Sequence, residues 1–380
     1  MDFDYSAEQR ELRDQARQFL AENWPCSRMR TLLEQPEVAT GREFCSRVAE
    51  LGWMGATIPE ALGGAGLGHV ELCALAEELG RALVPGPLSS TLFGFTEALR
   101  VAGDDAERAR WFPRIAAGEI HGSLAFHEGA GDPDATACTA EVRDGRLYGV
   151  KWPVTDGVFA DVAVVLALEQ GNPSMQLVEL DATVQRLPLP SLDDSRPVCR
   201  LAFDGIPARR LGDPGQGRAL VAGIMQRLAV LCAFEQLGGA DRCLEMARDH
   251  ALQRRAFGRP IGSFQAIKHR LADMYVRNEL ARSNAYLAAW ALAQDAPELG
   301  VAAAAARLAA SDAYEFAARE NLQVHGGIAI TWEADPHLYL RRARQLGAVA
   351  GSMGYWAERL TGELVDADRA AREAKHGFQG

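Results

Sequence analysis

The stretch that decides the fold is residues 254–265, which read RRAFGRPIGSFQ. Pro260 and two glycines interrupt an otherwise helical pattern, so the stretch predicts a turn between two long helices. Arg254, Phe257 and Gln265 bring a permanent cation, an aromatic ring and an amide together. They suit an anionic, planar ligand, because a guanidinium pairs with a pyrophosphate and an aromatic ring stacks on a base. The alternative is a plain turn whose arginine interacts with the helix dipole.

The chain on either side of this turn reads as helix. Amphipathic stretches rich in alanine and leucine occupy 217–256, 262–293, 299–325 and 335–365, which predicts a four-helix-type bundle. Residues 121–212 instead hold short β-rich runs at 162–166, 175–180 and 199–203, separated by turn clusters. Strands at this spacing, without helices between them, predict an antiparallel β-barrel.

The first third of the chain reads as helical again. Ser6 is placed to cap a first helix, and further helices are expected at about 42–51 and 70–83. The predicted fold is therefore mainly α with a central β domain. Its three regions are an N-terminal helical domain (1–120), a middle antiparallel β-barrel domain (121–212) and a C-terminal helical bundle (213–380).

Composition excludes several function classes. The 380 residues include 40 basic and 51 acidic side chains, and a net charge of −11 argues against a nucleic-acid partner. Seven cysteines without a CxxC pair, and histidines without close ligand spacing, predict neither a disulfide framework nor a metal site. The N-terminus is acidic and no apolar run reaches about 20 residues, so we expect a cytoplasmic protein without a membrane span.

A second motif, QVHGG, lies at residues 323–327, at the end of a predicted helix. Adjacent glycines permit a positive φ and a close approach of the backbone to another group. The motif is either a helix C-cap alone or a place where backbone amides meet a cofactor.

The two motifs in this order, followed by TWE at 331–333, resemble the acyl-CoA dehydrogenase family, and in character the subunits of its bacterial heteromeric members. The resemblance covers nearly the whole chain. It implies an FAD-dependent oxidoreductase that dehydrogenates the Cα–Cβ bond of an acyl-CoA thioester and passes electrons to an electron-transfer flavoprotein. It also implies a tetramer in which two subunits contact each FAD.

The resemblance assigns cofactor contacts residue by residue. Three residues are expected to reach the FAD of the neighbouring subunit: Arg254 at its pyrophosphate, Phe257 at its adenine side, and Gln265 as the polar partner of Phe257. The loop beneath that dinucleotide is matched by Gln323, Gly326 and Gly327. Pro153, Val154 and Thr155 match the segment that lines the flavin ring, where the family usually has Trp-Ile-Thr or Phe-Ile-Thr. The flavin-contacting loop of the family corresponds to 126–133, but its hydroxyl residues are missing here.

The catalytic carboxylate of the family is absent from both of its usual positions. Counted from the motifs, these positions are Ala350 and Leu228, with Gln226 close to the second. Glu235 lies seven residues beyond Leu228, on nearly the same helical face, within an apolar segment. It is an atypical catalytic base, one half of a structural pair with an arginine, or an exposed side chain.

The absence of a carboxylate at both usual positions leaves three alternative functions. The chain is an active dehydrogenase with an atypical acid such as Glu235, or it performs atypical flavin chemistry on a CoA thioester. Alternatively, it is the non-catalytic FAD-binding subunit of an α2β2 heterotetramer with a homologous chain, an arrangement that the resemblance associates with β-oxidation of steroid side chains. The sequence leaves open the acyl group (a fatty acid or a steroid side chain), the base, the electron acceptor and the choice between a homotetramer and a heterotetramer.

Overall fold

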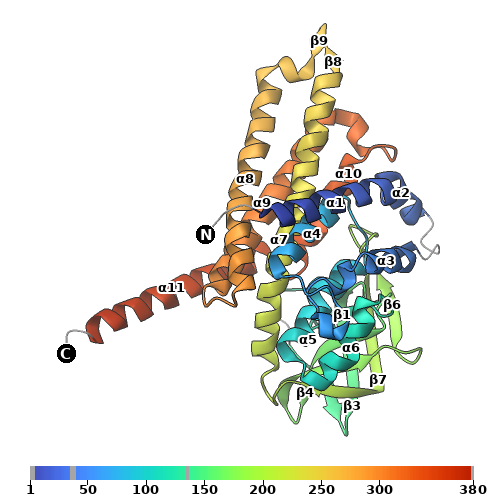
Figure 1. The fold of residues 1–380 in the computed structure, drawn as a ribbon, viewed down its shortest axis with the longest axis vertical. Helices are drawn as coiled ribbons and strands as arrows, with labels where there is room; N and C mark the ends of the chain where they lie inside the picture. The colour runs from blue at the N-terminus through green and yellow to red at the C-terminus, as the bar shows by residue number, and fades with distance from the viewer. Residues whose placement is uncertain (1–4, 35–39, 134–136, 378–380) are drawn as a thin grey trace.

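The structure, a computed structural model, describes residues 5–34, 40–133 and 137–377, and runs from helices to strands and back to helices (Figure 1). The first helical part holds α1 (Ala7–Asn23), α2 (Cys26–Glu34), α3 (Thr40–Glu50), α4 (His69–Arg81), the π-helical turn η3 (Ser90–Phe95), α5 (Thr96–Ala102) and α6 (Asp105–Ala116). The predicted helices at 42–51 and 70–83 are confirmed as α3 and α4, whereas α2, α5 and α6 were not predicted.

The start of α1 is set by a reciprocal cap. The Ser6 hydroxyl accepts from the Gln9 backbone N–H at 3.2 Å, and the Gln9 side chain accepts from the Ser6 N–H at 2.9 Å. Two backbone donors that the helix leaves without internal partners are thereby satisfied. The predicted cap at Ser6 is confirmed.

The central part is a seven-stranded sheet. Its strands are β1 (Gly122–Ala125), β2 (Glu141–Arg143), β3 (Arg146–Thr155), β4 (Val162–Glu169), β5 (Asn172–Glu179), β6 (Gln185–Leu189) and β7 (Val198–Leu211). Five strands close a ring in the order β4–β2–β3–β7–β5–β4. The pairs β1–β4 and β2–β4 are parallel and the others antiparallel, so the predicted antiparallel barrel is corrected to a mixed closed sheet. The parallel pairs join strands that no tight turn connects, and a tight turn is what enforces antiparallel pairing.

The second helical part begins with α7 (Gly217–Gln253), followed by α8 (Gln265–Ala293), α9 (Leu299–His325), α10 (Pro336–Ala348) and α11 (Met353–Gly377). Helix α7 is long and apolar enough to cross a membrane, but more than half of its most apolar window is buried within the protein. It packs against α4, α8 and α9, which marks it as the central helix of this part.

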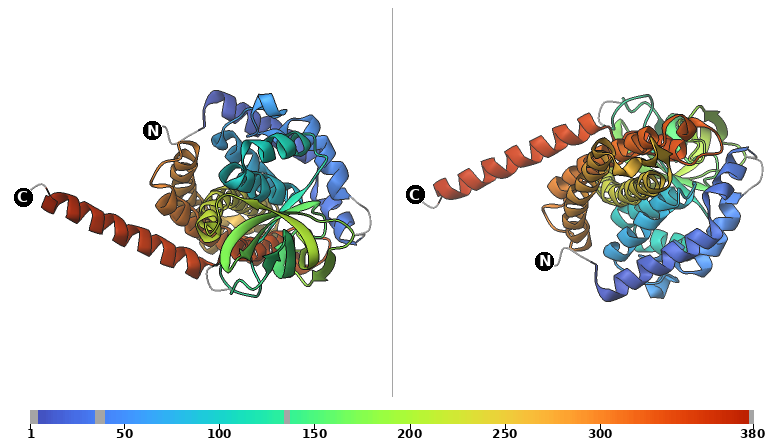
Figure 2. Two further views of the ribbon diagram at one scale, coloured as in Figure 1. Left: turned by 90° about the horizontal axis from the view of Figure 1, so that it is seen from below. Right: turned by 90° about the horizontal axis from the view of Figure 1, so that it is seen from above.

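The helix predicted over 335–365 is broken between α10 and α11. Ala350 and Gly351 both have positive φ values, of 63° and 98°, which a continuing right-handed helix does not contain. Beyond this break, α11 points away from the rest of the molecule in all views (Figures 1 and 2). The periodicity of the sequence continued across the break and therefore hid it.

Helices α4 and α7 cross at close range because, at the crossing, a glycine of each helix lies against the backbone of the other. A Cβ at Gly80 would lie 1.8 Å from the Glu235 carbonyl oxygen, and one at Gly238 would lie 1.7 Å from the Glu77 carbonyl oxygen. Either methyl group would force the helices apart. The crossing joins the first helical part of the chain to the second.

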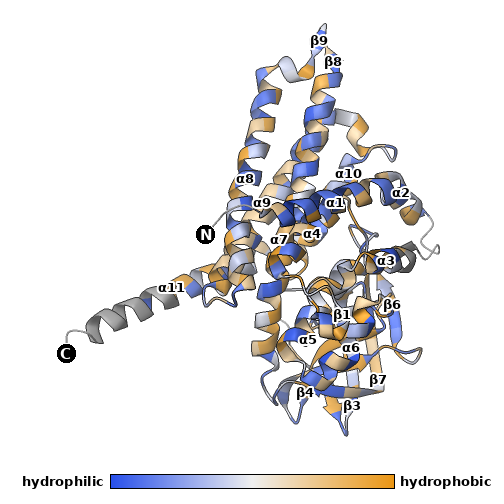
Figure 3. Ribbon diagram, viewed as in Figure 1, coloured by the Kyte–Doolittle hydropathy of each residue, from blue (hydrophilic) through white to orange (hydrophobic). Residues whose placement is uncertain are grey.

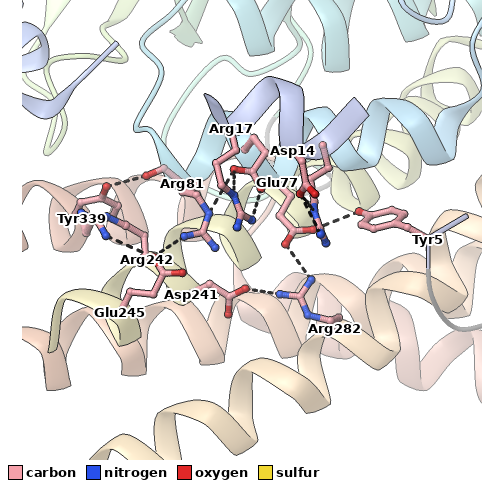
Figure 4. Close-up of polar contacts among 12 residues, drawn as sticks. Tyr5, Asp14, Arg17, Glu77, Arg81, Asp241, Arg242, Glu245, Arg282 and Tyr339 are labelled. Carbon is pink, nitrogen blue, oxygen red and sulfur yellow. Dashed lines mark hydrogen bonds and ion pairs between the residues drawn. The ribbon is translucent and has the colours of Figure 1, made fainter. Parts of the chain in front are cut away.

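Ion pairs between α4, α7 and α8 reinforce this crossing (Figure 4). Arg282 of α8 donates to Glu77 at 3.0 Å and also to Asp241 of α7. Arg81 of α4 donates to Glu245 of α7 at 2.7 Å. The side chain of Glu77 is 2% exposed and that of Arg282 is 16% exposed, so Glu77 in particular depends on its partner to offset the loss of hydration.

Candidate functional site

A cavity of about 650 Å³ lies where the sheet meets η3, α7 and the junction of α10 and α11. Much of its wall is apolar, with Phe93 from η3, Phe126 after β1 and Met225 from α7. A concave, largely apolar site with a few polar groups is the usual form of a small-molecule site. We take this cavity as the candidate site.

The segment that the sequence assigned to the flavin ring forms part of this wall. Pro153 and Thr155 line the cavity, while Val154 packs into the core of the sheet, as alternation along β3 requires. Ser123 of β1 also lines the cavity and donates its hydroxyl to the Thr155 carbonyl at 2.7 Å. The strand therefore presents two of the three predicted residues to a ligand in the cavity.

Both positions at which the family carries its carboxylate lie on the cavity wall. Leu228 contributes from α7 and Ala350 from the junction between α10 and α11. Among the described residues that line the cavity there is neither an aspartate nor a glutamate. The places where a base is expected are thus on the cavity surface and carry apolar side chains.

Glu235 lies close to this cavity but does not line it. Its side chain is 1% exposed and accepts from the Nη2 of Arg196 at 3.0 and 3.1 Å and from the Nη1 of Arg342 at 3.2 Å. Arg342 is equally buried and also pairs with Asp193. Of the three alternatives for Glu235, this geometry matches the structural pair with arginine, because both carboxylate oxygens are engaged.

The titratable residues that do line the cavity are His127, Arg196, Cys232 and Arg344. Burial raises the pKa of the Cys232 thiol to about 11, so it stays protonated at neutral pH. Burial, together with the Lys151 ammonium, lowers the pKa of His127 and keeps its imidazole neutral. A neutral imidazole accepts a proton, and His127 is the group of this set able to do so at pH 7.

Two of these residues, His127 and Arg196, were not predicted from the sequence as site residues. His127 belongs to the loop at 126–133, whose departure from the family pattern was noted, so a signal was present. Arg196 lies in an ordinary turn cluster between two strands, and only its position in space reveals it. Over the described residues, no group of three histidine, cysteine, aspartate or glutamate side chains is arranged to hold a metal ion.

The predicted dinucleotide contacts lie elsewhere, at one end of the helical bundle. A small hairpin of β8 (Arg255–Ala256) and β9 (Arg259–Pro260) projects at the top of Figure 1. Arg254 precedes this hairpin, Phe257 lies in its turn, and Gln265 begins the helix that follows it. All three side chains are exposed, and Phe257 is 96% exposed with φ at 52°. An aromatic ring held out in solvent by a left-handed backbone is poised for an external partner.

The second motif lies at the same end of the bundle. The rings of His250 on α7 and His325 on α9 stack with their centroids 4.1 Å apart, which ties the two helix ends together. Gln323, Gly326 and Gly327 are exposed, and a Cβ at either glycine would meet nothing within 4 Å. The structure thus brings both motifs to one open surface.

The cavity and this surface are far apart. Arg254 lies just beyond the end of α7, and Cys232, the cavity-lining residue of that helix nearest to it in the sequence, is about 33 Å away at roughly 1.5 Å per residue. A dinucleotide, whose two ring systems are joined by a single pyrophosphate, does not bridge that length. One bound dinucleotide therefore cannot contact both regions of the same chain.

Two family models match the sequence: Acyl-CoA dehydrogenase, N-terminal domain, over residues 6–119, and Acyl-CoA dehydrogenase, C-terminal domain, over residues 215–360. The chain belongs to the acyl-CoA dehydrogenase family. The acyl-CoA dehydrogenase IpdE2 of Mycobacterium tuberculosis is 36% identical over 85% of this chain and 86% of its own length. FadE34 of the same organism is 36% identical over 86% of this chain, which spans 43% of FadE34.

Solved structures agree with this assignment. The ChsE4–ChsE5 complex from Mycobacterium tuberculosis matches with a TM-score of 0.85 and 25% identity, over 96% of this chain and 99% of the matched one. A variant of the steroid ACAD Tcur3481–Tcur3483 matches with a TM-score of 0.85 and 30% identity, over 96% and 99%. The order of helical, β and helical parts is therefore that of the acyl-CoA dehydrogenase fold.

Proposed function

We propose that this member of the family is the FAD-contacting, base-lacking subunit of a heteromeric acyl-CoA dehydrogenase. The observation that carries the proposal is that the two positions expected to hold the catalytic carboxylate, Leu228 and Ala350, lie in the cavity wall and are apolar. The nearby carboxylate of Glu235 is bonded to two arginines. The names of the ChsE4–ChsE5 and Tcur3481–Tcur3483 structures support a two-chain assembly. A homologous subunit then supplies the carboxylate.

FAD fits what the chain presents. The exposed guanidinium of Arg254 and ring of Phe257, beside the open surface over Gly326 and Gly327, offer a cation, a stacking face and accessible backbone to a dinucleotide. Because Arg254 lies about 33 Å along α7 from Cys232 in the cavity wall of its own chain, the FAD that it holds belongs to the neighbouring subunit. Within the cavity, Pro153 and Thr155 would border a flavin ring.

Bound FAD would supply the acceptor for the hydride from the β-carbon of the acyl group, and we propose that an electron-transfer flavoprotein takes up the electrons. The chain's own residues would bind and orient the dinucleotide. Arg254 would hold the pyrophosphate through charge-assisted hydrogen bonds, Phe257 would cover the adenine side, and Gln265 would add a polar contact. The α-proton leaves through the carboxylate of the homologous subunit.

The exterior of α8 supports an assembly. It exposes five large apolar residues: Tyr275, Val276, Leu280, Leu287 and Trp290. Figure 3 shows hydrophobic positions recurring among hydrophilic ones along this helix. An exposed apolar surface of this kind marks an interaction site. We propose that it packs against the homologous subunit in an α2β2 tetramer.

Co-expression with a glutamate-bearing homologous subunit tests the proposal. We expect a stable complex that retains yellow FAD and reduces it with an acyl-CoA, whereas this chain alone retains little FAD and does not reduce it. A matched pair of variants separates cofactor binding from proton removal. Arg254→Ala in this chain should abolish turnover with loss of FAD. Replacing the catalytic base of the partner subunit should abolish turnover while FAD stays bound. FAD bound and reduced by this chain alone would overturn the proposal.

A second candidate is dehydrogenation in this chain's own cavity, with His127 as the proton acceptor. It is favoured by the neutral imidazole on the cavity wall. In that case the chain alone reduces FAD with an acyl-CoA, and His127→Gln abolishes the reduction while FAD stays bound. Under the first proposal the same variant leaves turnover by the complex unchanged.

A further inference from the structure

Two walls of the cavity meet where the loop after β1 touches the junction between α10 and α11. His127, Ala130 and Gly131 line the cavity from the loop. Val349 and Ala350 line it from the junction, one of them at a position where the family carries its carboxylate. These two segments are far apart in the sequence, so the contacts that hold them together decide the shape of the cavity.

Asp132 joins the two walls. Its carboxylate accepts from the Ser352 backbone N–H at 2.8 Å and from the Ser352 hydroxyl at 3.0 Å. We call this pair of hydrogen bonds the clasp. Neither Asp132 nor Ser352 lines the cavity, so the clasp supports the wall from behind. Hydrogen bonds to an ionised carboxylate are stronger than those between neutral groups, which suits a contact that holds a loop in place.

The junction is also fixed by groups outside the loop. Arg307 of α9 donates to the Val349 carbonyl at 2.6 Å. The indole Nε1 of Trp356, in the first turns of α11, donates to the Ala350 carbonyl at 2.8 Å. When the clasp is lost, the junction therefore keeps these supports, and the loop is the part that moves.

The loop is anchored at its other end by Glu128. The carboxylate of Glu128 accepts from the Lys151 ammonium at 2.6 Å and from the Thr139 backbone N–H at 2.7 Å. Between this anchor and Asp132 the chain is permissive, since Gly131 has a φ of 132°, which few other residues adopt. A short segment of this kind keeps one position only when both of its ends are held.

We propose that Asp132 is a positioning residue of the cavity. Through the clasp it holds residues 129–132 against the junction and closes the cavity on that side. A closed wall keeps water away from a ligand bound beside Ala350. The inference rests on the cavity as the candidate site and not on the two-subunit assembly, so it applies under either of the functions proposed above.

Two cysteines of α7 report an opening of this wall. Cys232 lines the cavity but is only 2% exposed, and it lies near the junction, since the charge of Arg307 acts on its thiol. Cys243 is fully buried in a second core and does not line the cavity. A thiol reagent reaches Cys232 when the wall opens locally, whereas it reaches Cys243 only when the packing around α7 is lost.

Labelling of the full chain with N-ethylmaleimide, measured peptide by peptide by mass spectrometry, gives both rates. Each rate is compared with that of the same cysteine in the wild type. We expect Asp132→Ala to raise the rate at Cys232 at least about tenfold and to leave the rate at Cys243 within about twofold. Asp132→Asn keeps the size and one acceptor oxygen, so its rate at Cys232 should lie in between, and it decides the question if the alanine variant fails to fold.

Two further variants show that the effect belongs to the clasp. Ser352→Thr keeps both donors and should label like the wild type. Asp181→Ala is the matched control, because Asp181 accepts from the N–H of Thr183 at 2.8 Å and from its hydroxyl, within the turn between β5 and β6. Neither Asp181 nor Thr183 lines the cavity, so this variant should leave both rates within about twofold of the wild type.

Three results would overturn the inference. They are an unchanged rate at Cys232 in both Asp132 variants, a rise at Cys232 that Cys243 matches, and a Ser352→Thr protein that labels as fast as Asp132→Ala. The second result would indicate a general loss of stability rather than a local opening. All three are ratios of labelling rates, whereas the two-subunit proposal is tested by FAD content and turnover, so the failure of one is distinguishable from the failure of the other.

Discussion

Replacing Glu235 with glutamine separates a structural from a catalytic role. In the wild type its carboxylate is bonded to Arg196 and Arg342, and all three side chains are almost completely buried. Removing one partner of a buried ion pair costs about 3–5 kcal/mol, because the remaining charges stay buried without compensation. Glutamine still offers one carbonyl oxygen, so we expect the lower value. About 3 kcal/mol raises the ratio of unfolded to folded protein roughly a hundredfold.

Chemical denaturation followed by circular dichroism measures this loss. The matched control is Glu141→Gln, because Glu141 and Arg143 are 3.2 Å apart, as Glu235 and Arg342 are, but both side chains are about half exposed. Its free energy of unfolding should stay within about 0.5 kcal/mol of the wild type. A Glu235→Gln protein of wild-type stability that binds FAD but no longer reduces it with an acyl-CoA would refute the structural assignment and identify Glu235 as the base.

Three further predictions concern the helix crossing, the hairpin and a buried acid. Gly238→Ala should lower the free energy of unfolding by about 3 kcal/mol or more, because its methyl group meets the Glu77 carbonyl. Gly223→Ala on the same helix, with open space around it, should raise that free energy by up to about 1 kcal/mol. Arg254→Ala should weaken FAD binding by the complex at least about tenfold, by equilibrium dialysis, without lowering the thermal midpoint of the isolated chain. Burial raises the folded-state pKa of Asp156 above 3.8, so its contribution to stability is present at low pH and lost as pH rises through that pKa. Asp156→Asn should therefore gain stability relative to the wild type as pH rises above 3.8, in thermal scans.

Long helices and local caps were predictable because they depend on neighbours in the sequence. The segment predicted at 299–325 coincides with α9, and the Ser6 cap is observed. The broken helix at Ala350 was not predictable, since the break depends on a positive φ that periodicity does not record. The parallel strand pairs were missed for a similar reason, because pairing between distant strands is decided in three dimensions. The domain boundaries near 121 and 213 stay a prediction.

The candidate site was predictable in part. The family resemblance assigned cofactor contacts to Arg254, Phe257 and Thr155, of which Thr155 lines the cavity, while the other two stay a prediction. It also located Leu228 and Ala350 as positions without a carboxylate, and both line the cavity. It could not show that Glu235 is bonded to two arginines, because Arg196 and Arg342 come from distant segments.

The separation between the hairpin and the cavity along α7 has a consequence for complexes that carry an altered chain. In the proposed assembly, damage to the hairpin of one chain disables the cofactor of its neighbour, while damage to a cavity disables only the chain that carries it. A change at Arg254 of this chain and a change at the partner's base then affect the same catalytic centre, so a complex that carries both changes should be no less active than a complex that carries the base change alone.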